Sequence, residues 1–223
     1  MKLHDSYYIQ RIGVEKSEEL EEFLMNHFLF EEPLNRASGM SRDAFGQFVK
    51  NLFARTLNVP FSFAVFEKDT NKMVGCSMSS IWNRSSESHE ESGEEFAFGE
   101  ANPKIDAVGR ILTNLHAQFF ELKPDVHSVL HLEILSVAKD HQRRGIASCL
   151  MEMQENVEEI QKMGASGIAS EISSLANQHL MKKRGYETLT FTLLSSELDV
   201  DNQPLLITDD GTDRVDLVYK QFI

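Results

Sequence analysis

The chain has 223 residues, of which 41% are hydrophobic and 26% are charged, and its formal net charge is −13. This composition predicts a globular protein with a substantial core. The acidic balance argues against nucleic acid as the main partner, because phosphate backbones bind clustered Lys and Arg. It is compatible with a cationic substrate, although many proteins are acidic only for solubility. No apolar run approaches the roughly 20 residues of a membrane span, so we expect no membrane partner.

The two cysteines, Cys76 and Cys149, lie in apolar stretches and form no CxxC pair. We expect both thiols to be buried and reduced. Residues 1–16 contain no apolar segment of the signal-peptide type, which together with the thiols predicts a cytoplasmic protein. No cluster of Cys and His has the spacing of a metal site, so we expect no metal.

The first part of the chain predicts strands and helices in alternation. Apolar residues recur at helical spacing over residues 17–30, and Ser17 is a candidate N-cap. Pro33 should end this helix, because proline disfavours helical geometry at the residue before it. The other expected elements are strands over residues 7–14, 61–68 and 72–82 and a helix over residues 42–57.

Residues 85–100, SSESHEESGEEFAFGE, contain six Glu and no Lys or Arg. Such a run is typical of a solvated loop. A second interpretation is an acidic rim that attracts a cation.

The second part of the chain continues the alternation. Helices are expected over residues 105–122, 144–164 and 173–185, and strands over residues 128–137, 165–170, 186–194 and 214–223. No linker or repeat interrupts the pattern. We therefore expect one mixed α/β domain over residues 1–223.

The most informative stretch is ILSVAKDHQRRGIASCLM, residues 134–151. An apolar strand pattern ends, a short basic segment containing Gly145 follows, and a helical pattern begins. Unpaired N–H groups at a helix N-terminus behind a glycine-containing turn bind anions, most often phosphate. The stretch contains neither GxxxxGK[ST] nor GxGxxG. An ordinary strand–helix connection with exposed basic residues is the alternative.

Gln142-Arg143-Arg144-Gly145-Ile146-Ala147 resembles the [QR]-x-x-G-x-[GA] pyrophosphate loop of the GNAT acetyltransferases. FEEPLN (30–35), ILSV (134–137) and SEISSLANQHLMKKRGYE (170–187) are similar to the arylalkylamine N-acetyltransferase-like branch, especially its insect dopamine-acetylating members. The resemblance extends over the whole chain in the same order. It implies the GNAT fold, in which helices flank a mixed, mostly antiparallel central sheet that is splayed at the acetyl-CoA site.

The resemblance also implies acetyl-CoA as co-substrate and a set of residues that bind it. Backbone groups of the splayed strand would contact the pantetheine arm and the thioester, and the loop amides would hold the pyrophosphate. Asn177 falls near the thiol, where the branch has a second Ser. The implied set is Ile134, Leu135, Ser136, Val137, Gln142, Arg143, Arg144, Gly145, Ile146, Ala147, Ser148 and Asn177.

Three residues are candidates for proton transfer. Glu32 matches the general base of the insect enzymes and would act through ordered water or with a raised pKa; otherwise it is a solvated helix-end carboxylate. Ser173 matches the first of two serines near the thiol and is our candidate proton donor, or else a helix N-cap. Met181 occupies the position at which many GNAT enzymes have a tyrosine acid. Glu133, on the central strand with His131 on the same face, is a rival base.

The function that the resemblance implies is acetyl transfer from acetyl-CoA to a small primary amine, with an arylalkylamine as the favoured acceptor, directly in a ternary complex. Phe28, Phe30, Phe45 and Phe48 are either walls of the amine pocket or plain core. A polyamine or another aliphatic amine is the alternative acceptor and would suit the acidic segment 85–100. The third possibility is a non-catalytic CoA-binding module, based on the departures at Asn177 and Gln142. Either a monomer or a homodimer is compatible with the sequence.

Overall fold

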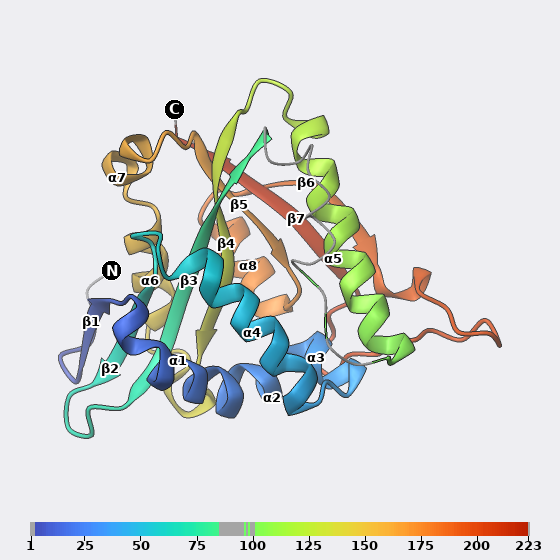
Figure 1. Cartoon of the computed structure of the whole chain (residues 1–223), viewed down its shortest axis with the longest axis horizontal. Coiled ribbons are helices and arrows are strands. Elements are labelled where there is room, and N and C mark those ends of the chain that lie inside the picture. The colour runs from blue at the N-terminus through green and yellow to red at the C-terminus, as the bar shows by residue number, and fades with distance from the viewer. Residues whose placement is uncertain (1–2, 85–95, 97, 99–100, 223) are drawn as a thin grey trace.

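The computed structural model describes residues 3–84, 96, 98 and 101–222. Within these residues the strands form one seven-stranded sheet in the order β1-β2-β3-β4-β5-β7-β6 (Figure 1). Neighbouring strands are antiparallel except β4 and β5, which are parallel. The predicted mixed, mostly antiparallel sheet is thus confirmed. The strands are β1 (Tyr7–Arg11), β2 (Phe63–Glu67), β3 (Met73–Asn83), β4 (Ser128–Val137), β5 (Gly167–Ile172), β6 (Glu187–Leu193) and β7 (Arg214–Gln221).

Helices cover both faces of the sheet (Figure 1). Apolar side chains of α1, α4 and α5 pack on one face, and those of α6, α7 and α8 pack on the other. None of the helices in the described part of the chain has the length and apolar character needed to cross a bilayer. The helices are α1 (Ser17–Phe23), α2 (Leu29–Glu31), α3 (Pro33–Ser38), α4 (Arg42–Thr56), α5 (Pro103–Leu122), α6 (Ile146–Gln154), α7 (Val157–Lys162) and α8 (Leu175–Lys183).

The predicted helix over residues 17–30 is an α1–α2 unit interrupted by a π-helical turn over Leu24–Phe28. Ser17 is not its N-cap, because the 3-10 turn Val14–Lys16 leads directly into the helix. The predicted break before Pro33 is confirmed. Glu32 is extended (φ −74°, ψ 127°), and Pro33 begins the next helix, α3, where its missing N–H costs nothing.

The predicted helix over residues 144–164 is also two helices. The Asn156 side chain accepts a hydrogen bond from Glu159 N and starts α7, which stops the first helix at Gln154. Gln154 is fully buried, and its amide bonds Ser79 Oγ, Ser77 Oγ and the carbonyl of Phe61 at 2.8 Å each. These bonds attach the end of α6 to β3, and the chain turns away after them.

The two central strands, β4 and β5, are paired near their N-terminal ends and then separate. β4 pairs with β5 only at Leu130↔Ile168 and His131↔Ala169, whereas its pairing with β3 continues to Val137. A bond from Ser170 Oγ to the carbonyl of Leu132 (2.6 Å) continues the contact beyond the last paired residues. The expected splay of the sheet is therefore present, and it leaves backbone groups of β4 without a β5 partner.

The cysteines agree with the sequence prediction. Cys76 and Cys149 are free thiols, and both side chains are buried. Burial raises the pKa of the Cys76 thiol, which makes it a poor nucleophile.

Candidate functional site

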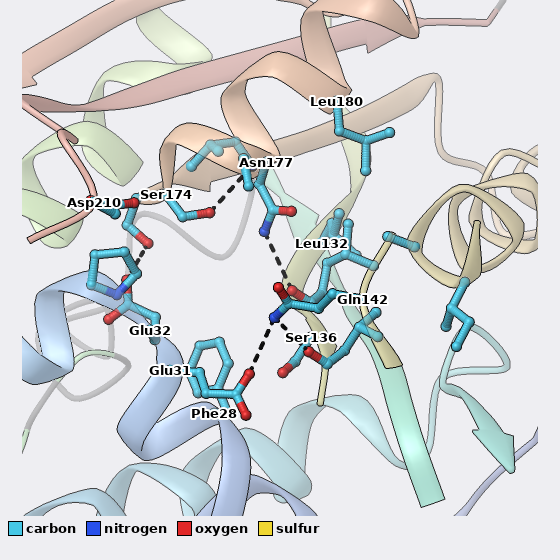
Figure 2. Close-up of a pocket in the computed structure, with 18 of the residues that line it drawn as sticks. Phe28, Glu31, Glu32, Leu132, Ser136, Gln142, Ser174, Asn177, Leu180 and Asp210 are labelled. Carbon is cyan, nitrogen blue, oxygen red and sulfur yellow. Dashed lines mark hydrogen bonds between the residues drawn. The ribbon is translucent and has the colours of Figure 1, made fainter. Parts of the chain in front are cut away.

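A cavity of about 540 Å³, the main cavity, lies where β4 and β5 separate. In Figure 2, Phe28, Glu31 and Glu32 of the N-terminal segments face Ser136 and Gln142, and Asn177 of α8 lies above them. Ten of the twelve predicted cofactor residues line this cavity, namely Leu135, Ser136, Val137, Gln142, Arg143, Gly145, Ile146, Ala147, Ser148 and Asn177.

The loop before α6 has the backbone form of an anion site. Arg143 (φ 59°) and Gly145 (φ 80°) are both left-handed, and none of the described side chains caps the N-terminus of α6. The first N–H groups of α6 therefore remain available to a ligand. Gln142 Nε2 donates to the carbonyl of Val137 (3.0 Å) and to Glu31 (3.3 Å), which ties the loop to β4 and α2.

Two predicted cofactor residues, Ile134 and Arg144, are not among the residues that line the main cavity. The guanidinium of Arg144 donates to Tyr7 Oη (2.6 Å) and to the carbonyl of Asp140 (2.9 Å), so this side chain anchors the loop and does not line the main cavity. Ile134 is buried and lines a second, smaller cavity described below. The resemblance implies contacts to acetyl-CoA from the backbone of both residues, and the direction of their side chains does not test that prediction.

Glu32 and Ser173 are 141 positions apart in the chain and are joined by a hydrogen bond. Ser173 Oγ donates to Glu32 Oε1 at 2.7 Å, and Asn35 N donates to Glu32 Oε2 at 2.6 Å. Glu32 is therefore the N-cap of α3 and not a solvated carboxylate, since only 9% of the residue is exposed. Burial raises the pKa of Glu32, and the donated hydrogen bonds only partly offset this effect.

Ser174 and Asn177, which follow Ser173, have separate structural roles. The N-cap of α8 is Ser174, whose Oγ accepts from Asn177 N at 3.3 Å, and this leaves the Ser173 hydroxyl to Glu32. The Asn177 amide donates to the carbonyl of Leu135 at 3.3 Å. Asn177 thus holds α8 against the part of β4 that has separated from β5.

Four side chains form a buried ion-pair cluster beside the site: Arg55, Glu133, His131 and Glu171. Arg55 donates to both oxygens of Glu133, at 2.7 and 2.8 Å. His131 lies 2.7 Å from Glu171 and 3.4 Å from Glu133. Burial disfavours the charged imidazole, but the two carboxylates more than offset this and raise the pKa of His131 to about 10. Burial also opposes ionisation of Glu133, and Arg55 and His131 override it, so the pKa of Glu133 is lowered.

Sequence reasoning identified His131 as a partner of Glu133 but missed Arg55 and Glu171. Arg55 falls at helical spacing from Phe48 and Leu52 on the buried stripe of α4, and a charge on an apolar stripe is a usable signal. Glu171 shares a strand face with Ala169, but the predicted strand ended at residue 170.

A second cavity of about 70 Å³, the side cavity, opens beside the main one. The predicted Phe28, Phe45 and Phe48 line it together with Phe96 and Phe98, whereas Phe30 is 52% exposed and lies elsewhere. The rest of the acidic segment 85–100 lies outside the described residues. Among the described residues, five line both cavities, namely Phe28, Glu32, Glu133, Glu171 and Ser173.

The sequence matches no model of a known protein family and none of the curated proteins. Solved structures are similar over the whole chain. Arylalkylamine N-acetyltransferase 2 from Aedes aegypti has a TM-score of 0.81 at 18% identity, with 97% of this chain and 99% of that chain covered. The apo form of an agmatine N-acetyltransferase mutant gives 0.79 at 19% identity, covering 98% of this chain and 100% of that chain.

A polyamine N-acetyltransferase from Drosophila melanogaster gives a TM-score of 0.78 at 18% identity, covering 97% of this chain and 100% of that chain. Identities this low are informative about architecture rather than activity. The splayed sheet, the glycine loop before α6 and these likenesses agree, and the chain has the fold of the GNAT N-acetyltransferases that its sequence resembles.

Proposed function

We propose that this protein is an acetyl-CoA-dependent N-acetyltransferase whose acceptor is a small primary amine, with an arylalkylamine as the first candidate. The observation that carries the proposal is the 2.7 Å hydrogen bond from Ser173 to Glu32 where the main and side cavities share their lining. A thioester in the main cavity and an amine in the side cavity would meet at this pair. Glu32 and Ser173 are then the catalytic residues.

The main cavity suits acetyl-CoA. Uncapped N–H groups at the start of α6 and the left-handed loop backbone are complementary to a pyrophosphate. Beyond Leu132, the free edge of β4 offers backbone groups for the pantetheine amides and the thioester carbonyl. A volume of about 540 Å³ lies in the range of small-molecule sites, roughly 300–1,000 Å³.

The geometry supports a two-residue proton relay. The amine nitrogen attacks the thioester carbonyl, the N–C bond forms, and Glu32 accepts the proton that the nitrogen loses. The C–S bond then breaks, and the Ser173 hydroxyl protonates the departing thiolate while Glu32 returns its proton to Ser173. A raised pKa makes Glu32 a stronger base than an ordinary carboxylate. Glu133 suits this role less, because Arg55 occupies both of its oxygens and its pKa is lowered.

The acceptor pocket supports an arylalkylamine, because aromatic side chains make up much of the side cavity and favour an aromatic ring. A specific observation keeps a polyamine or another aliphatic amine as second candidate. Among the described residues, three carboxylates line both cavities, and they would favour a cationic chain. A non-catalytic CoA-binding module draws less support, since the hydrogen bond between Ser173 and Glu32 suits a proton relay.

The test is release of CoA thiol from acetyl-CoA in the presence of a panel of amines. Tyramine, dopamine, serotonin and tryptamine form the aromatic set, and spermidine, putrescine and agmatine form the aliphatic set. Turnover on the aromatic set supports the first candidate, and turnover only on the aliphatic set supports the second. No turnover on either set, with acetyl-CoA still raising the melting temperature, contradicts the amine acetyltransferase and favours the binding module.

Replacement of Gly145 by Ala is expected to weaken acetyl-CoA binding roughly tenfold. The left-handed backbone costs a residue with a Cβ about 1–2 kcal/mol, and relief of this strain would move the loop amides. Calorimetric titration with acetyl-CoA measures the effect. Gly164→Ala is the matched control, because Gly164 has φ 73° with open space around it and lies after α7. Equal affinities in the two variants would contradict the loop assignment.

Loss of the Ser173 hydroxyl is expected to move the pH dependence of kcat/KM. The hydroxyl stabilises the ionised Glu32, so Ser173→Ala should raise the pKa of Glu32 further and shift the acidic limb to higher pH. A pH profile of kcat/KM with one acceptor measures the shift. Ser174→Ala removes the α8 N-cap and about 1 kcal/mol of stability, but it should leave the limb in place. If the acidic limb of Ser173→Ala lies at the same pH as that of wild type, Ser173 does not influence the pKa of Glu32.

A further inference from the structure

Glu171 has one carboxylate oxygen with a partner and one without. Its side chain, on β5 at the point where β4 separates, is 3% exposed. Oε2 lies 2.7 Å from His131 Nε2. Oε1 is fully buried and has no hydrogen-bond partner within the part of the chain that the structure describes. Glu171 lines both cavities, so the residue lies at the boundary where the two substrates would meet.

The neighbouring carboxylates do not share this property. Both oxygens of Glu133 accept from the Arg55 guanidinium. Both oxygens of Glu32 accept hydrogen bonds, one from Ser173 and one from Asn35 N. Glu171 therefore offers the spare acceptor among the described carboxylates that line both cavities. A buried acceptor without a donor is costly, and such groups normally meet a ligand or water.

The charges around Glu171 leave room for one more cation. Arg55 and protonated His131 carry two positive charges, and Glu133 and Glu171 carry two negative charges. Ionised Glu32, needed as a base, adds a negative charge that these groups do not balance. An alkylamine reaches the site mainly as an ammonium, whose pKa is about 10.4 by analogy with Lys.

We infer that Glu171 Oε1 binds the ammonium group of the acceptor, and that Glu171 selects cationic amines over neutral nucleophiles. The inference rests on the proposed function and names its substrate class. Of the three N–H groups of the ammonium, one donates to Glu171 and one transfers its proton to Glu32, which releases it to solvent before the attack. The neutral amine stays hydrogen-bonded to Glu171, and its freed electron pair attacks the thioester. The Glu32 carboxylate then takes the second proton as the N–C bond forms, and this proton reaches the thiolate through Ser173.

The test is Glu171→Gln, which keeps the side-chain volume and an acceptor for His131 but removes the charge. Phenethylamine is the cationic acceptor, and O-benzylhydroxylamine, with the same number of heavy atoms, is the neutral one at pH 7. We expect kcat/KM for phenethylamine to fall about 10- to 100-fold, the size of a charge-assisted hydrogen bond. The value for O-benzylhydroxylamine should change by less than about threefold, and acetyl-CoA affinity should not change.

Glu155→Gln is the matched control. Glu155 is a largely buried carboxylate paired with Arg184 and Lys220, and it lines neither cavity. This variant should keep the wild-type ratio of kcat/KM values for the two acceptors. An equal fall for both acceptors in Glu171→Gln would assign Glu171 a structural role only, and wild-type kcat/KM values for both acceptors would likewise overturn the inference.

Binding measurements separate this inference from the proposed function. If the wild type releases no thiol with any amine, the proposed function fails, and titration of phenethylamine into CoA-loaded protein tests Glu171 alone. Weaker binding to Glu171→Gln than to wild type then supports the inference, whereas equal binding, or no binding to wild type, overturns it. If Glu171→Gln does not fold, Glu171→Asp takes its place. Glu171→Asp withdraws the carboxylate by one methylene, so it should lower the ratio of kcat/KM for phenethylamine to kcat/KM for O-benzylhydroxylamine. An unchanged ratio contradicts the inference.

Discussion

Glu32→Gln is expected to lower kcat/KM for the acceptor amine by about 10²- to 10⁴-fold, the contribution of a positioned general base. Gln keeps the volume of Glu, and its carbonyl can still accept from Asn35 N, so the cap of α3 survives. It cannot accept a proton. Steady-state thiol release with acetyl-CoA and the best amine of the panel measures the fall, and calorimetry should show unchanged acetyl-CoA affinity.

The pH profile gives this prediction a second readout. Because the pKa of Glu32 is raised, the acidic limb of the wild-type profile should lie above pH 4.5, the ordinary value for a glutamate, and it should vanish in Glu32→Gln. When a carboxyl group has a raised pKa in the folded state, its ionisation lowers the free energy of unfolding as pH rises through that pKa. Glu32→Gln has no group to ionise at this position, so its free energy of unfolding at pH 7 should be no lower than that of wild type. Glu22→Gln, on the exposed side of α1, changes the same charge and should keep full activity. An active Glu32→Gln with the acidic limb intact would assign the base elsewhere.

Arg55→Met is expected to destabilise the fold by about 3–5 kcal/mol, because it leaves Glu133 as a buried charge without its main partner. For a chain of this length the loss corresponds to a fall in melting temperature of about 6–20 °C. Thermal unfolding followed by circular dichroism measures it. Replacing Glu133 by Gln as well should restore part of the stability, since the charge that has lost its partner is then removed.

Arg110→Met provides the matched control for burial. Arg110 lies 2.7 Å from Glu197, the same separation as in the Arg55–Glu133 pair, but the Arg110 side chain is 52% exposed. Exposed pairs contribute about 0–1 kcal/mol, so this variant should unfold near the wild-type temperature. Equal falls in melting temperature for Arg55→Met and Arg110→Met would show that burial does not determine how much an ion pair contributes to stability.

Local pattern was enough to predict most of the elements. The alternation of apolar residues gave β4 with its bounds over residues 128–137, and Pro33 correctly predicted the break that leaves Glu32 extended. The glycine loop before α6 was visible because it needs a left-handed residue at Gly145. The resemblance identified Glu32 and Ser173 as separate candidates. Their hydrogen bond was not predictable, since it depends on how segments 141 residues apart pack together.

The features that local pattern did not predict also depend on specific hydrogen bonds and on contacts between distant segments. The π-helical turn and the second helix starting at Asn156 arise from competing local hydrogen bonds, which a 3.6-residue period does not register. Arg55 could have been found as a charge on the buried stripe of α4, and Glu171 was missed because the predicted strand ended one residue too early. Their ion-pair partners lie on other elements and were not predictable from local pattern. The direction of the Arg144 side chain was unpredictable for the same reason, since Tyr7 determines it from the other end of the chain.

The π-helical turn over Leu24–Phe28 has a consequence for how the first helix can change. Such a turn accommodates one more residue than the α-helix around it, and each residue of an α-helix advances the chain by about 100°. The turn absorbs its extra residue locally, so deletion of one residue within it should give a regular α-helix in which Glu31 and Glu32 still face the main cavity. A one-residue deletion in a regular helix such as α4 has no such turn to absorb it and rotates the residues that follow by about 100°. The first helix is therefore the part of this site that should tolerate a change in length.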